Sequence, residues 1–262
     1  MLSRTANHLY WMARYIERAE NMARILDVTE NMALVPNAAL DEGALWWPAL
    51  EISGTTESFK EHFKESTASN VIHYLAMDRN NPSSIYSTLY SARENARAVR
   101  VALTTETWEN INALWLEFSQ FDAKNLAENG LREFCDWVKS RSHLFRGVSA
   151  GTMLQDDAYH FLRLGTFIER ADNTARILDV KYHTLLPSAE AVGGAVDYYQ
   201  WSALLRSVGA FESYRKIYRD VILPRRVTEL LILRADVPCS LRTCMASLHE
   251  IIEAMMQGNV LD

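Results

Sequence analysis

Two Glu-Arg steps, Glu17-Arg18 and Glu169-Arg170, are the residues of this sequence best suited to charge-based chemistry. Adjacent residues on a helix point about 100° apart, so the two members of a step cannot pair with each other. A partner on the same helix must lie three or four residues away, and neither Arg18 nor Arg170 has a carboxylate there. Because an unpaired buried charge is costly, we expect each arginine to find its counter-charge on another helix.

Two interpretations account for these steps. In the structural one, Arg18 pairs with Glu169 and Arg170 pairs with Glu17, reciprocally, because the same surfaces of two similar helices meet. In the functional one, the arginines hold a carboxylate or phosphate of a ligand or partner. We favour the structural network, since buried ion networks also form where there is no function.

The residues around each step recur with the same spacing, which gives eight candidate site residues: Glu17, Arg18, Asn21 and Arg24, and Glu169, Arg170, Asn173 and Arg176. Arg24 has Glu20 four residues before it, and Arg176 has Asp172. Ordinary ion pairs within one helix therefore account for these last two arginines.

Secondary candidates lie outside the steps. His8 and His160 occupy matching places ahead of them, where an imidazole could serve acid–base chemistry, although a core or capping role is commoner. Arg93, Glu94 and Arg97 fall on another predicted helix, and only the glutamate persists at the matching place in the second half of the chain. A solvated helix face accounts for these three residues.

Metal and cofactor motifs are missing from the sequence. A di-iron bundle needs Glu-x-x-His on facing helices, and none occurs. Cys239 and Cys244 are five residues apart, which is poor spacing for zinc. There is no Gly-rich phosphate loop, Gly-x-Ser-x-Gly or His-Glu-x-x-His. We therefore expect neither a metal nor a cofactor.

The elements that position the steps form an internal repeat. Residues 14–28 read RYIERAENMARILDV and residues 166–180 read TFIERADNTARILDV, at an offset of 152. Fainter matches continue downstream while the offset rises to 156, as small loop insertions between shared helices would produce. We interpret this as a duplication, with copies at 1–150 and 151–262 packed about a pseudo-two-fold axis.

Both copies carry the pattern of a helix. Apolar residues follow strict heptad spacing in each: Leu9, Met12, Ile16, Ala19, Ala23 and Leu26, and Phe161, Leu164, Ile168, Ala171, Ala175 and Leu178. Further helices are predicted after Pro82 and after Pro238, and across 106–120 and 128–140. No alternating strand pattern appears. The fold class predicted is all-α, an antiparallel helical bundle.

Composition narrows the class of protein. Hydrophobic residues make up 48% of the chain, enough for a substantial core. The net charge of −6 argues against nucleic-acid binding, and no apolar run approaches the roughly 20 residues that span a bilayer. Three cysteines without a secretion signal favour reduced thiols and a cytoplasmic location.

The sequence resembles the bacterial alpha-E family, an α-helical family that typically carries a duplicated Glu-Arg motif. The resemblance rests on YIERAEN (15–21), FIERADN (167–173), RENAR (93–97) and ETWENIN (106–112). It runs over nearly the whole chain. Cys239 stands between Pro238 and Ser240, where the family would place an arginine.

The resemblance implies a peptide synthesis or modification system. Its other components are circularly permuted ATP-grasp ligases, a transglutaminase-like protein and an N-terminal-nucleophile peptidase. We therefore expect a non-catalytic helical partner of an ATP-grasp amide ligase, which binds the ligase or presents its peptide or amino-acid substrate.

The alternative is an enzyme in which Glu17 or Glu169 acts as base while Arg18 or Arg170 clamps a carboxylate. A pocket containing both steps would favour the enzyme, and a dry interface around them would favour the partner.

Overall fold

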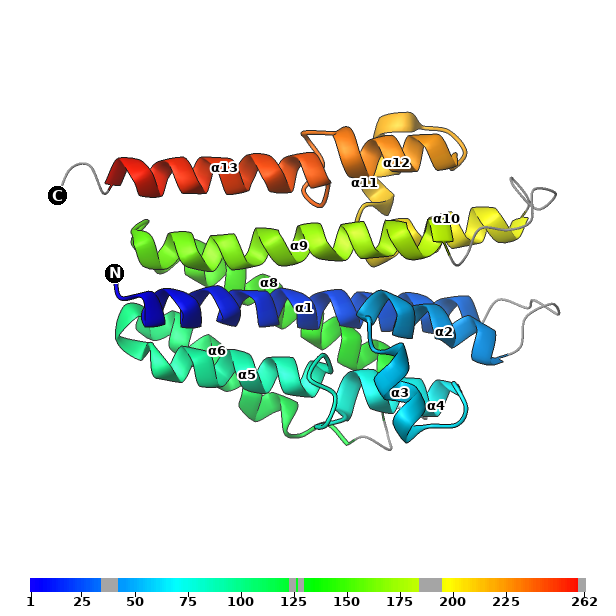
Figure 1. The fold of residues 1–262 in the computed structure, drawn as a ribbon, viewed down its shortest axis with the longest axis horizontal. Coiled ribbons are helices and arrows are strands. Elements are labelled where there is room, and N and C mark those ends of the chain that lie inside the picture. The colour runs from blue at the N-terminus through cyan, green and yellow to red at the C-terminus, as the bar shows by residue number, and fades with distance from the viewer. Residues whose placement is uncertain (34–41, 123–125, 127–129, 184–194, 259–262) are drawn as a thin grey trace.

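The computed structural model describes residues 1–33, 42–122, 126, 130–183 and 195–258, and every regular element in these ranges is a helix (Figure 1). The predicted all-α class is therefore confirmed. The first half contains α1 (Ser3–Ala33), α2 (Glu42–Ser53), α3 (Thr56–His62), α4 (Ala68–Ile72), the π-helix η1 (His73–Met77), α5 (Ile85–Ala98), the 3₁₀-helix η2 (Arg100–Ala102), α6 (Thr105–Phe118) and α8 (Leu131–Thr152). The second contains α9 (Asp157–His183), α10 (Ala195–Ser207), α11 (Phe211–Tyr218), α12 (Pro224–Leu233) and α13 (Leu241–Gly258).

Helices α1 and α9 form the centre of the bundle. Helix α5 packs on the far side of α1, and α13 packs on the far side of α9 (Figure 1). The long helices α5, α6, α8 and α9 alternate in direction along the chain, but α1 and α9 run parallel. Ion-paired residues on these two helices accordingly differ by a nearly constant 151 to 155 in number.

Matching positions of the two halves repeat the same local structures. Gly54 and Gly209 both have a φ of 69°, and each donates its backbone N–H to the carbonyl three residues earlier. Ser84 caps α5 and Ser240 caps α13, because each hydroxyl accepts the backbone N–H three residues later. A duplication predicts such pairs of features. The duplication, its pseudo-two-fold axis and its copies at 1–150 and 151–262 stay predictions.

The predicted apolar stripe is correct for α1 and partly wrong for α9. All six stripe residues of α1 are buried, whereas in α9 only Ala171 and Leu178 are buried and Ala175 is exposed. The difference arises because α1 is covered by more helices than α9. Helix α8 packs on α1, and no helix takes the corresponding place on α9 within the described ranges. One face of α9 therefore meets solvent.

Gly165 sets the closest approach of α9 to α1. A Cβ built on Gly165 would lie 2.2 Å from the Tyr10 carbonyl oxygen and 3.2 Å from the Ala13 Cβ. Because an oxygen of the α1 backbone occupies that space, only glycine fits at this position.

No helix in the described ranges is long and apolar enough to cross a membrane.

Candidate functional site

The reciprocal pairing predicted for the Glu-Arg steps is confirmed. Arg18 Nε donates to Glu169 Oε1 at 2.6 Å, and Arg18 Nη2 donates to Glu169 Oε2 at 3.0 Å. In the opposite sense, Arg170 Nε donates to Glu17 Oε1 at 2.7 Å. The two glutamates are each only 4% exposed. The network therefore joins α1 to α9 inside the bundle.

Each of these glutamates has a second arginine. Arg14, one turn before Arg18 on α1, donates through Nε to Glu169 Oε2 at 2.6 Å. Thr166 stands at the place in α9 that corresponds to Arg14, so α9 cannot supply a second arginine there. For Glu17 that role is filled by Arg146 of α8, whose Nη1 donates to Oε2 at 2.7 Å.

Glu20 extends the network toward α8. Its Oε2 accepts from Arg146 Nη1 at 2.6 Å and from Ser142 Oγ at 2.7 Å. Its Oε1 accepts from Arg24 Nη2 at 2.8 Å, as predicted for that intrahelical pair, and lies 3.2 Å from His143 Nε2. Burial raises the pKa of Glu20, but Arg146 and Arg24 outweigh that effect and lower it to about 2.

This pKa predicts a specific loss of stability in acid. Glu20 titrates near its ordinary value of 4.5 when unfolded and at about 2 when folded, so its stabilising contribution is complete above the first value and is lost as the pH falls through the second. The expected loss is on the order of 3 kcal/mol of unfolding free energy, measured by urea denaturation at a series of pH values. In Glu20→Gln, this part of the dependence of unfolding free energy on pH should disappear. An unchanged pH dependence in the variant would contradict the assignment.

A cavity of about 310 Å³, cavity A, borders this network. It lies among helices α1, α8 and α9 and the segments 208–209 and 237–239. Its polar lining consists of Glu17, Glu20, Asn21 and Arg24, His143 and Arg146, Arg170, Asn173, Thr174 and Ser213. The His143 side chain is 54% exposed, so the cavity opens to solvent on that side.

A smaller cavity of about 100 Å³, cavity B, also lies between α1 and α9. Its charged lining consists of Arg18, Glu169, Asp172 and Arg176. Each α1 or α9 residue that lines cavity A corresponds, at the repeat offset of 152, to a residue that lines cavity B. Each Glu-Arg step is thus divided, because Glu17 and Arg170 border cavity A while Arg18 and Glu169 border cavity B. The site is neither a single pocket with both complete steps nor a dry interface.

Asn21 and Asn173 line both cavities. Asn21 is only 9% exposed, and its amide nitrogen has no hydrogen-bond partner among the described residues. Such a group costs roughly 1–3 kcal/mol when it is left unpaired.

Three other predicted residues, Arg176, His8 and His160, lie outside the reciprocal Glu-Arg pairs. Arg176 Nε pairs with Asp172 at 2.9 Å, as predicted. His8 Nδ1 lies 2.6 Å from Asn95 Oδ1 of α5, about two and a half turns of α1 from Glu17. His160 borders a different cavity, near the start of α9. Neither histidine joins the Glu-Arg network.

The three charged residues of α5 also lie apart from the network. Arg93 and Arg97 both pair with Glu94, and Arg93 Nε also donates to Asn112 of α6 at 3.0 Å. All three side chains are partly or largely exposed. They form the solvated face that their spacing indicated.

Cys239 lines cavity A at the position where an arginine was expected. Burial raises the pKa of its thiol to about 11, despite the opposing effect of Arg170. The thiol therefore stays protonated and weakly nucleophilic at neutral pH. The described residues contain no group of three or more His, Cys, Asp or Glu side chains placed to hold a metal ion.

Sequence reasoning missed Arg14, Arg146 and His143. For Arg146 a signal was available, since no carboxylate lies three or four residues from it on α8. That is the same test that singled out Arg18. Arg14 gave no such signal, because Glu17 lies three residues after it and offered a local partner.

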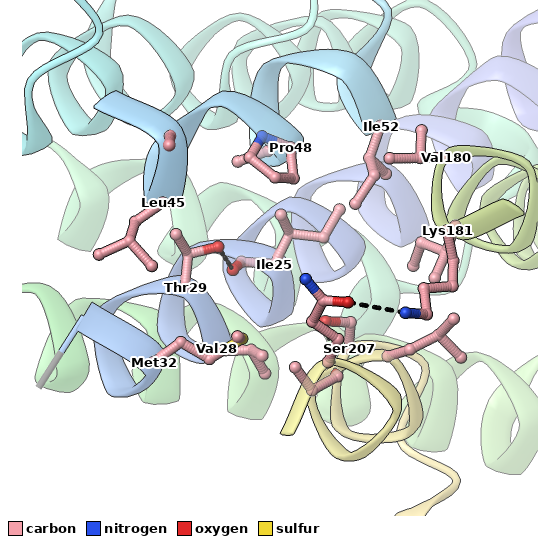
Figure 2. A pocket seen from close by; sticks show the side chains of 16 residues that line it. Ile25, Val28, Thr29, Met32, Leu45, Pro48, Ile52, Val180, Lys181 and Ser207 are labelled. Carbon is pink, nitrogen blue, oxygen red and sulfur yellow. Dashed lines mark hydrogen bonds between the residues drawn. The ribbon is translucent and has the colours of Figure 1, made fainter. Parts of the chain in front are cut away.

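A further cavity, of about 130 Å³, lies among α1, α2, α9 and α10 (Figure 2). Apolar side chains such as Ile25, Leu45 and Val180 line most of it. At its edge the ammonium of Lys181, only 2% exposed, donates to Gln200 at 2.7 Å and to Asp197 at 2.8 Å. This cavity has the size of one benzene-like group and no part in the Glu-Arg network.

Comparison with known proteins places the chain in a family. Residues 1–260 match the profile of the Alpha-E family, described as a predicted alpha-helical domain with a conserved ER motif, so the chain belongs to that family. It is 26% identical over 259 residues to uncharacterised proteins of Mycobacterium bovis and Mycobacterium tuberculosis. The match covers 91% of this chain and 28% of each relative, so the chain spans less than a third of their length. No solved structure matches the chain.

Proposed function

We propose that this protein is a non-catalytic helical partner of an ATP-grasp-type amide ligase and that it holds the ligase's peptide or amino-acid substrate at cavity A. The family resemblance suggests the ligase, together with a transglutaminase-like protein in the same system. The observation that carries the non-catalytic role is the state of the carboxylates. Glu17 and Glu169 each accept bonds from two arginines, and the pKa of Glu20 is lowered to about 2. Carboxylates engaged in this way are poor general bases.

The mycobacterial relatives add indirect support. In each of them the region similar to this chain is 28% of the polypeptide. A helical unit that occurs within much longer chains is suited to work beside another domain, either in the same polypeptide or as a separate subunit.

Co-expression with the ATP-grasp ligase from the same genome tests the proposal. We expect the two proteins to elute together in size-exclusion chromatography after affinity capture through either one. The complex should survive Met22→Leu, a conservative change in a buried α1 side chain, which serves as the control for handling. Reproducible separation of the two purified proteins at micromolar concentration would refute the partnership.

One observation favours the alternative of an enzyme acting on a peptide or amino-acid substrate: the acids and arginines of both steps line cavities A and B. In that case the purified protein alone would turn over peptide substrates, and Glu17→Gln would abolish the reaction. The same assay distinguishes the two functions, since a non-catalytic partner shows no turnover without the ligase.

A further inference from the structure

The hydrogen-bonding groups left unused around cavity A are predominantly donors. Both oxygens of Glu17 and both oxygens of Glu20 already accept bonds from arginine or serine. Within the described residues, Arg170 donates hydrogen bonds through Nε alone and Arg146 through Nη1 alone. A guanidinium carries five N–H donors, so most of the donors on these two arginines remain available.

The charges that line cavity A do not balance. Three arginines, Arg24, Arg146 and Arg170, stand against two glutamates, Glu17 and Glu20, which leaves one formal positive charge. Pro238 and Cys239, just before the N-terminus of α13, also line the cavity, and a helix N-terminus favours negative charge. A bound anion with a single negative charge would neutralise the remaining positive charge.

Asn21 supplies an independent observation. The residue is only 9% exposed and lines the cavity, and its side chain makes no hydrogen bond to the described part of the protein. Asn173, at the corresponding place on α9, also makes no side-chain hydrogen bond within the described residues. A carboxamide both donates and accepts, so these two residues suit a ligand that carries an amide next to its charged group.

We propose that cavity A binds the carboxylate of an amide-containing ligand, such as the C-terminal end of a peptide, through Arg146, Arg170 and Asn21. The proposal rests on the proposed function in assigning a ligand to cavity A, and it adds the chemical group and the residues that hold it. One ligand binds per chain, because the two arginines of cavity B are balanced by Glu169 and Asp172 and its volume is only about 100 Å³.

Arg146 explains why the repeated Glu-Arg pattern gives one proposed carboxylate site and not two. It comes from α8, which packs on α1, and cavity B has no lining residue from α8. The unbalanced positive charge is therefore found at cavity A and is absent from cavity B.

Isothermal titration calorimetry of the purified full chain with N-acetylglycine tests the proposal. We expect one site per chain, and binding at least about tenfold weaker for the neutral N-acetylglycinamide, since a charge-assisted hydrogen bond contributes a factor of that size. Two equivalent sites, no binding of N-acetylglycine, equal binding of the neutral analogue, or tighter binding of inorganic phosphate would each overturn it.

Asn21→Leu provides the variant test. Because the Asn21 side chain makes no hydrogen bond within the described residues, the variant should be at least as stable as the parent and should bind N-acetylglycine about tenfold more weakly. Asn21→Asp keeps the side-chain shape and adds a negative charge, so it should weaken binding further. This second variant shows whether a loss of binding in Asn21→Leu comes merely from poor packing of the leucine. Met22 lines cavity B and is not part of the lining of cavity A, so the control variant Met22→Leu should bind N-acetylglycine like the parent.

Unchanged binding in both Asn21 variants would overturn the assignment. The titration uses the protein alone, so its failure leaves the ligase partnership to be judged by co-purification. A failure to co-purify likewise leaves the binding result intact.

Discussion

Replacing Gly165 with alanine is expected to destabilise the protein by about 3 kcal/mol, at the upper end of the usual cost of overpacking. The new Cβ would lie 2.2 Å from the Tyr10 carbonyl oxygen and 3.1 Å from its carbonyl carbon. Those atoms belong to the α1 backbone and cannot rotate away, so α1 and α9 must move apart. That movement stretches the ion pairs between them. Urea denaturation followed by circular dichroism measures the loss.

Gly151→Ala and Gly147→Ala are the matched controls. Both glycines lie within α8, and a Cβ at either position meets nothing within 4 Å. Alanine should stabilise these positions by roughly 0.5–1 kcal/mol, because glycine loses more conformational entropy in a helix. If Gly165→Ala behaved like the controls, the close approach of the two helices at Tyr10 would be refuted.

Replacing Glu169 with glutamine is expected to cost about 3 kcal/mol of unfolding free energy, because breaking a buried ion pair leaves its partners uncompensated. Arg14 and Arg18 both donate to this carboxylate at 2.6 Å, and their side chains are only 15% and 26% exposed. An amide of the same shape keeps the packing but removes the charge. Thermal and urea denaturation at neutral pH measure the effect.

Asp172→Asn is the matched control one turn further along α9. Within the described residues Asp172 pairs with Arg176, and the two side chains are 36% and 51% exposed, so the change should cost less than about 1 kcal/mol. Replacing Glu169, Arg14 and Arg18 together by methionine should restore most of the stability lost in Glu169→Gln, because no unpaired charge remains. Without such recovery, the loss in Glu169→Gln would have to come from packing.

The central ion network was largely predictable from local sequence. Arg18 and Arg170 have no acid within reach on their own helices, and the repeat supplied Glu169 and Glu17 at matching places. The predicted pairs are the observed ones. Local sequence fails where it offers a competing partner. Arg14 could pair with Glu17 three residues on, yet it pairs with Glu169 across the interface.

Features that depend on unequal coverage were not predictable from the repeat. The sequence stripe of α9 matches that of α1, but Ala175 is exposed because α8 covers only α1. The same helix delivers Arg146 to Glu17, in compensation for Thr166 at the place that Arg14 occupies in α1. A pairwise comparison of the two halves cannot show which half a third helix will cover.

The parallel alignment of α1 and α9 makes their charge pattern self-complementary. A helix with glutamate followed directly by arginine can satisfy both charges against an identical helix laid beside it in register. A homodimer of one half would therefore form the same reciprocal pairs without any second sequence. The predicted duplication would join two such halves in one polypeptide, where they need not stay identical, so that one side could acquire the proposed binding site while the other keeps only its structural role.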